Sequence, residues 1–118
     1  MNHGCLLTAN NKTCVIPRVK RTTNFLERMR GLLFSPPLQS GEALLIEPCR
    51  SVHTIGMAYA IDLVFLDADW KVVKIVSNLK SWRSTNCRQA IMVLELMGKS
   101  LKHLNLSEGQ QLKWQDEK

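Results

Sequence analysis

The sequence predicts a mainly β (α+β) protein: a distorted antiparallel β-sandwich or open barrel, with one helix in the N-terminal half and a short helix in the C-terminal half. Strand-like apolar runs recur about every 8–12 residues after Gly41, and few segments have helical periodicity. The chain has 118 residues, of which 45% are hydrophobic and 22% charged. This length and composition are typical of one soluble globular domain, 1–118.

Two segments have the features of helices. Asn24 and Glu27 have the spacing of a capping box, and the apolar side chains after it follow helical spacing until Gly31 or the Pro36-Pro37 pair ends the predicted helix. We therefore expect a helix over 24–33 that packs one apolar face on a sheet. A second, short helix is expected at Ser100–Leu106.

The remaining ordered segments are expected to be strands. The expected strands are, in order, Cys5–Ala9, Cys14–Val19, Ala43–Ile46, Val52–Met57, Ile61–Leu66, Val72–Val76, Gln89–Leu96 and Gln110–Trp114. The polar Asn10-Asn11-Lys12 run predicts a hairpin turn between the first two. Asp67 and Asp69 suit a second hairpin turn, because Asp side chains accept hydrogen bonds from nearby backbone amides, so Asp67 is assigned a structural role.

The net charge of +6 is concentrated at the N-terminus. Residues 1–30 hold six bases and one acid, whereas residues 31–118 hold ten bases and nine acids. A short basic stretch such as Arg18 to Arg30 is more often a solvated face than a phosphate groove. It contains one aromatic residue, Phe25, whereas single-strand binding uses several aromatic side chains that stack on successive bases. Nucleic acid is therefore only a weak alternative partner.

The chain is expected to stay in the cytoplasm. No run approaches the ~18 apolar residues of a membrane helix, and residues 1–11 lack the basic start and apolar core of a signal peptide. The cysteines are Cys5, Cys14, Cys49 and Cys87. Reduced thiols are expected in that compartment, and the Cys-x-x-Cys spacing of redox and zinc motifs is absent.

Side chains capable of catalysis or metal binding alternate with core-like strands between Cys49 and Leu96. Thiol catalysis would need a cysteine beside His53, with Asp62 to orient the imidazole, so Cys49, His53, Asp62 and Cys87 are the catalytic candidates. The metal candidates are Cys49, His53 and Cys87. On one straight strand Cys49 and His53 would lie about 13 Å apart, too far to share an ion, so only a turn or bulge near Cys49, which Pro48 makes possible, could bring them together. Structural thiols and a hydrogen-bonded histidine are the favoured interpretation, and no cofactor is expected.

Asp62 is expected to be buried or at the rim of a cavity. Ile61, Leu63 and Phe65 share one strand face, while Val64 and Leu66 share the other with Asp62. A buried carboxylate needs a donor, for which Arg28, His53 or Arg83 is expected. A structural anchor is favoured over a ligand-binding group.

The segment Trp82-Arg83 precedes Cys87 in a polar stretch, expected to be an exposed loop. Its side chains either stack on a ring-bearing or anionic ligand or cover the edge of the core.

Three motifs carry a resemblance to a known family. They are Arg28-Met-Arg-Gly31-Leu-Leu, Ile61-Asp62-Leu-Val-Phe-Leu-Asp67 and Val93-Leu-Glu95-Leu-Met-Gly98. In this order they resemble the bacterial and archaeal domain of unknown function 192, over residues 15–114. Cys49 with His53-Thr-Ile-Gly-Met57 is similar to one subgroup. The resemblance implies a compact, distorted β-sandwich with a helix near its start and no established activity, and it makes Arg28, Gly31 and Glu95 structural candidates.

We therefore expect a binding or accessory module rather than an enzyme. Its unknown small ligand or protein partner would contact the surface made by Cys49 to Met57, Asp62 and Trp82 to Arg88. The residues assigned to that surface are His53, Thr54, Met57, Asp62, Trp82 and Arg83. A thiol- or metal-dependent enzyme using Cys49, His53, Asp62 and Cys87 is the alternative.

Overall fold

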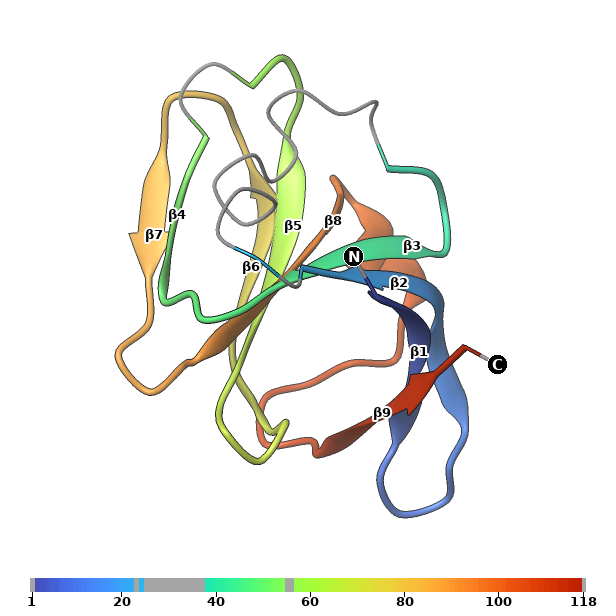
Figure 1. Ribbon diagram of the computed structural model, residues 1–118. Coiled ribbons are helices and arrows are strands. Elements are labelled where there is room, and N and C mark those ends of the chain that lie inside the picture. Colours follow the sequence, from blue (N-terminus) through green and yellow to red (C-terminus); the bar gives the residue numbers. More distant parts are fainter. Residues whose placement is uncertain (1, 23, 25–37, 55–56, 118) are drawn as a thin grey trace.

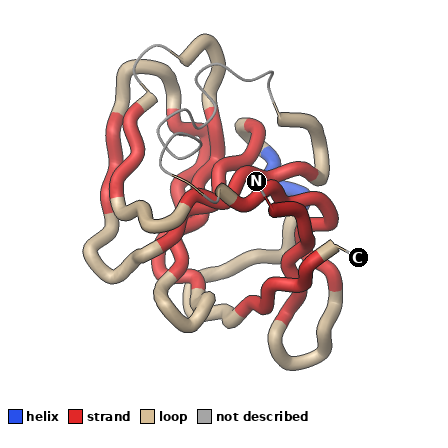
Figure 2. Tube along the Cα trace, viewed as in Figure 1, coloured by secondary structure: helices blue, strands red, loops and turns tan. Residues whose placement is uncertain are grey.

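The computed structural model describes residues 2–22, 24, 38–54 and 57–117. Their elements are β1 (Asn2–Thr8), β2 (Cys14–Arg21), β3 (Glu42–Ile46), β4 (Ser51–His53), β5 (Ile61–Leu66), β6 (Val72–Leu79), β7 (Ser84–Asn86), β8 (Met92–Met97), the 3₁₀ helix η1 (Ser100–His103) and β9 (Leu112–Asp116). Strands dominate this part of the chain (Figures 1 and 2). The mainly β prediction is therefore confirmed.

The main sheet has seven strands in the order β6-β5-β8-β3-β2-β1-β9. It curls into a half-barrel (Figure 1), whose two outermost strands approach each other at their first residues. There, Val72 donates a backbone hydrogen bond of 2.8 Å to Gln110, and Leu112 donates one of 2.9 Å to Trp70. A two-stranded ribbon, β4-β7, forms a separate layer at the edge of the molecule.

The two faces of the sheet bury two apolar clusters. Leu6, Ile16, Leu45, Val64 and Leu94 belong to the cluster inside the half-barrel. The cluster on the outer face lies between the sheet and the β4-β7 ribbon; its members include Val52, Ile61, Leu63, Phe65, Cys87 and Val93. β5 alternates between the two clusters, as its sequence predicted. All six of its residues are buried, so this strand contributes to the core on both faces of the sheet.

Several strand predictions agree closely with the structure. β5 has the predicted bounds, and the β1-β2 hairpin turns at Asn10-Asn11-Lys12, where Lys12 has φ of 57°. The carboxylate of Asp67 accepts backbone hydrogen bonds of 2.9 Å from Asp69 and 3.0 Å from Lys71. Asp67 therefore shapes the β5-β6 turn as predicted.

Other predictions need correction. The helix expected at Ser100–Leu106 is a single 3₁₀ turn, and the described residues contain no α-helix. The helix expected over 24–33 falls outside the described residues, as do Arg28 and Gly31. The sheet is not wholly antiparallel, because β2 and β3 pair in parallel. No helix in the described part of the chain has the length and apolar character needed to cross a membrane.

Two further segments differ from the predicted secondary structure. The strand expected at Val52–Met57 ends at His53, because the next residue, Thr54, turns the chain and accepts a backbone hydrogen bond of 3.2 Å from Met57. The segment Ser84–Asn86, expected to be an exposed loop, forms strand β7 against β4. Its two outward side chains are nevertheless exposed.

Candidate functional site

Asp62 is completely buried and is held by backbone amides. Its Oδ1 accepts hydrogen bonds from Asn78 N at 2.6 Å and Lys99 N at 3.0 Å, and its Oδ2 accepts one from Leu101 N at 2.8 Å. Asn78 and Lys99 both have positive φ, 53° and 71°. The prediction that His53 or Arg83 donates to Asp62 is therefore wrong. The donors are backbone amides of two segments, at residue 78 and at residues 99–101. This geometry makes Asp62 an anchor inside the half-barrel.

Thr54 is also completely buried, and it holds the loop that joins β6 to β7. Its hydroxyl donates to Lys80 O at 2.6 Å and accepts from Arg83 N at 2.9 Å. Its backbone carbonyl accepts from Trp82 N at 3.2 Å, and its amide donates to Arg83 O at 2.9 Å. Ser81 donates its hydroxyl to Met57 O at 2.6 Å. The buried Thr54 and the backbone carbonyl of Met57 thus position the loop 80–83.

Trp82 lies at the tip of this loop and is 68% exposed. Its backbone has φ of 62°, a conformation that costs a bulky L-residue roughly 1–2 kcal/mol. Arg83 and His53 are exposed beside it, and His53 pairs with Ser84 across the ribbon. Of the residues assigned to a binding surface, His53, Trp82 and Arg83 are therefore the three that reach solvent together. We call these three residues the Trp82 surface.

Cys49 and Cys87 belong to the apolar cluster on the outer face of the sheet. Cys49 donates its Sγ–H to Ser51 O at 3.2 Å, and Cys87 donates to Gln89 Oε1 at 3.5 Å. His53 points away from this cluster, because the neighbouring Val52 fills the inward position of β4. Asp62 lies on the opposite face of the sheet. Within the described ranges, no three His, Cys, Asp or Glu side chains are grouped to hold a metal.

Glu95 is a second buried carboxylate, and burial disfavours its ionisation. It lies on β8 opposite Leu44 and Leu63, on the outer face of the sheet, and is 6% exposed. Its Oε2 and the buried hydroxyl of Tyr59 make no hydrogen bond with any residue that the structure describes. Burial raises the pKa of Glu95 to about 7. The pKa of Tyr59 is also raised, first by burial and then by the charge of Glu95.

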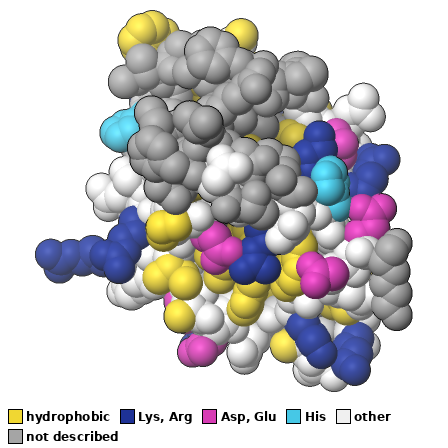
Figure 3. Space-filling model, viewed as in Figure 1, with side chains coloured by type: hydrophobic (Ala, Val, Ile, Leu, Met, Phe, Trp, Pro, Cys, Tyr) yellow, Lys and Arg dark blue, Asp and Glu magenta, His cyan; other side chains and the backbone are white. Residues whose placement is uncertain are grey.

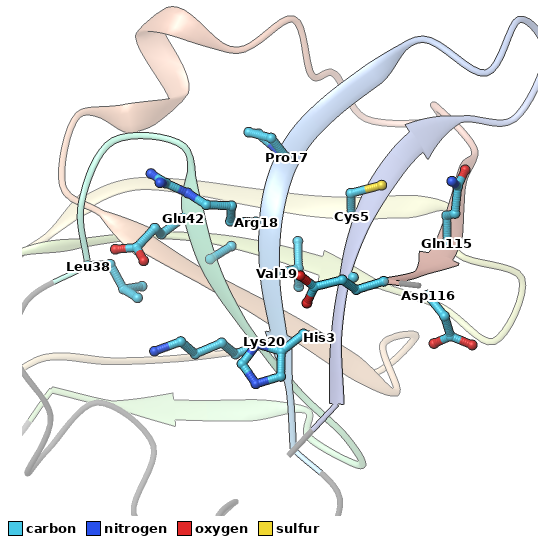
Figure 4. Close-up of a pocket in the computed structure, with 13 residues that line it drawn as sticks. His3, Cys5, Pro17, Arg18, Val19, Lys20, Leu38, Glu42, Gln115 and Asp116 are labelled. Carbon is cyan, nitrogen blue, oxygen red and sulfur yellow. The ribbon is translucent and has the colours of Figure 1, made fainter.

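An open pocket of about 560 Å³ lies over β1, β2, β3 and the end of β9 (Figure 4). Its walls hold the bases His3, Arg18 and Lys20 and the acids Glu42, Asp116 and Glu117. The space-filling view shows acidic and basic side chains interspersed over this part of the molecule (Figure 3). Because the charges are mixed, the pocket favours neither an anionic nor a cationic ligand.

Some of these roles left weak signals in the sequence. The position of Glu95 between apolar residues, in Val93-Leu-Glu-Leu96, indicates a carboxylate within a core strand. The pocket between β1, β2, β3 and β9 left no signal, because it depends on the parallel pairing of distant segments. The buried Thr54 is likewise recognisable only through its contacts with residues 80–83.

The overall fold is similar to that of two solved structures. A protein of unknown function from Novosphingobium aromaticivorans superposes with a TM-score of 0.72 at 18% identity, over 95% of this chain and 84% of that one. A "putative transcription regulator" from Sinorhizobium meliloti superposes with a TM-score of 0.77 at 19% identity, over 96% of this chain and 92% of that one. At these identities the similarity concerns the fold alone.

The chain belongs to the uncharacterised family DUF192, whose model, described as Uncharacterized ACR, matches residues 6–114. The resemblance read from the sequence motifs is therefore confirmed. A curated relative, the UPF0127 protein PH1112 of Pyrococcus horikoshii, is 35% identical over 68 residues. That match covers 55% of this chain and 58% of the relative. The function of this family is not established.

Proposed function

We propose that this protein is a binding module and that it recognises its partner through the Trp82 surface. The observation that supports this best is the conformation of Trp82, which is 68% exposed at a φ of 62°. A large apolar side chain gains little stability from such exposure, and the backbone conformation has a cost. Residues held in such unfavourable backbone conformations cluster at sites that contact another molecule.

The hydrogen bonds of Thr54 support a rigid recognition surface. They fix the carbonyls of Lys80 and Arg83 and the amides of Trp82 and Arg83. A surface that is already ordered loses less conformational entropy when it binds. Trp and Arg, adjacent at the tip, are residue types that dominate the energy of many interfaces. Asp62 and the cysteines serve this proposal only by stabilising the scaffold.

The first prediction compares two exposed apolar side chains. Trp82→Ala should abolish retention of the partner from a cell extract on immobilised protein, while Met97→Ala should leave it unchanged. Met97 is the matched control, because it is the other large hydrophobic side chain exposed among the described residues, at 39%. Mass spectrometry of the retained material measures the effect, with and without nuclease treatment.

Two results would contradict the proposal. Equal retention by the Trp82→Ala and parent proteins would exclude this surface. Unusually fast labelling of Cys49 or Cys87 near neutral pH, together with thiol-dependent turnover, would instead favour the enzyme alternative, because reactive cysteines are thiolates in electropositive, accessible surroundings.

A further inference from the structure

The β4-β7 ribbon and its adjoining loops carry bases but no acids. The sequence has no Asp or Glu between Pro48 and Ile61 or between Trp70 and Leu94. The exposed bases around the ribbon are Arg50, Lys80, Arg83 and Arg88. Although residues 31–118 have nearly balanced charge, the ribbon and its adjoining loops therefore form a positively charged layer.

The four acids that border these segments in the sequence are not exposed on the ribbon, since Asp69 lies in the β5-β6 turn and Glu95 is buried on β8. Glu47 forms an ion pair with Arg21 of β2. Asp62 is buried on the other side of the sheet, where its carboxylate accepts three backbone hydrogen bonds. Lys74 is directed at the ribbon itself, since its Nζ donates to Thr85 Oγ1 at 3.0 Å and Asn86 O at 2.8 Å. It adds positive charge to the layer.

The outward face of the ribbon is entirely polar. Val52 is buried against the outer-face cluster, and its cross-strand partner Thr85 occupies the same inward side. The outward positions of the two strands are Ser51, His53, Ser84 and Asn86, and all four are exposed. Hydroxyl, imidazole and amide groups both donate and accept hydrogen bonds, as contacts with base edges require.

The bases lie at both ends of this polar face. Ser51 pairs with Asn86 at one end, next to Arg50 and Arg88, and Arg83 adjoins the other end. Paired strands lie about 4.8 Å apart, so a two-stranded ribbon with its side chains fits the roughly 12 Å major groove of B-DNA. The exposed Arg side chains at the two ribbon ends are of the residue type that contacts the phosphates bordering the groove.

We propose that the protein binds duplex DNA, with the outward face of the β4-β7 ribbon in the major groove and the flanking bases on the phosphates. This rests on the proposed binding function and names its partner. The basic stretch at Arg18 to Arg30 is not used, because Arg18 and Lys20 line the mixed-charge pocket together with the acids Glu42, Asp116 and Glu117.

The surface fits duplex DNA better than it fits a single-stranded nucleic acid or an acidic protein. Single strands are held by several aromatic side chains that stack on successive bases, whereas Trp82 is the single Trp, Tyr or Phe exposed in the described part of the chain. Protein interfaces bury an apolar centre, and the outward face of the ribbon offers none. Trp82 lies at the end of the ribbon, where it would contact the sugar-phosphate backbone.

Fluorescence anisotropy with a labelled duplex of two helical turns tests the proposal. Four phosphate contacts predict that log K falls with log salt with a slope of about −3.6, with a Kd on the order of 10⁻⁵ M at physiological salt and tighter binding at low salt. The double variant Arg83→Gln/Arg88→Gln should reduce that slope by about 1.8. The matched variant Arg18→Gln/Lys20→Gln removes the same charge outside the ribbon and should change it little. Circular dichroism verifies that both variants fold.

Each alternative gives a distinct result. An equal loss in both double variants, or no duplex binding at low salt, would overturn the proposal. Tighter binding of the matching single strand, or of labelled poly-glutamate, would replace duplex DNA with that class of partner. A nuclease-resistant partner that requires Trp82, together with no DNA binding, would refute the DNA inference while leaving the proposed binding function intact.

Discussion

Single buried polar residues explain how this fold joins segments distant in the sequence. Asp62 unites β5 with the end of β6 and with the turn that begins η1, through three backbone amides. Two of the amides belong to residues at positive φ, Asn78 and Lys99, a conformation that non-glycine residues seldom adopt. A carboxylate with two acceptor oxygens can satisfy all three donors, and this offsets the backbone strain.

Asp62→Asn should lower the free energy of unfolding by about 1.5–3 kcal/mol, the value of a charge-assisted hydrogen bond. The asparagine Oδ1 can still accept from Asn78 and Lys99, but its amide nitrogen is a donor and faces the donor of Leu101. Chemical denaturation measures the change. Asp69→Asn, at the exposed β5-β6 turn, removes the same charge and should leave stability nearly unchanged; equal effects of the two variants would contradict the anchor role.

At the scale of elements, sequence patterns located the strands whose side chains are apolar. β5 was predicted with its bounds, because Ile61–Leu66 has buried residues on both faces and turn residues after it. β7 was not, since Ser-Thr-Asn has no apolar periodicity and becomes a strand only through pairing with β4. The parallel β2-β3 pair was also missed, because pairing partners are set by long-range packing.

The candidate site was predicted in part for the same reason. The burial of Asp62 followed from its apolar neighbours on β5, and the exposure of Trp82 and Arg83 followed from their polar surroundings. The backbone donors to Asp62 lie as far away as Leu101, and sequence patterns do not record such contacts. The one-sign charge of the ribbon was hidden for a similar reason, since Arg50 and Arg88 come from segments that meet only in the fold.

The loop 80–83 is the element whose rigidity the proposed function needs. Thr54→Val keeps the side-chain shape but removes the hydroxyl that bonds Lys80 O and Arg83 N. Leaving these groups without that partner should cost about 1–3 kcal/mol and accelerate hydrogen exchange of the Arg83 amide. Thr13→Val, at the exposed β1-β2 turn, is the control. Unchanged exchange at Arg83 in Thr54→Val would show that the loop is held by other contacts.

For the whole molecule, stability is distributed over two clusters on opposite faces of one sheet, and the outer one contains a carboxylate. Glu95 faces Leu44 and Leu63 across its two neighbouring strands. Charging it there has a desolvation cost, and burial accordingly raises its pKa from 4.5 to about 7. The native state therefore holds this proton more tightly than the unfolded chain does.

The stability of the protein should consequently decrease as pH rises through this window. Below pH 4.5 both states are protonated, and Glu95 adds no pH dependence. Between pH 4.5 and about 7 unfolding releases the proton, so the free energy of unfolding falls, by about 3 kcal/mol in total for a shift of this size. Above pH 7 the loss is complete.

Glu95→Gln cannot ionise and should remove this slope, making the variant more stable than the parent at pH 8 and similar to it at pH 4. Glu108→Gln, in an exposed turn, should retain the slope of the parent. Denaturant melts of the three proteins across this pH range measure the effect. A parallel decline in the parent and in Glu95→Gln would mean that another group controls the pH dependence, because only a residue that still ionises can produce it.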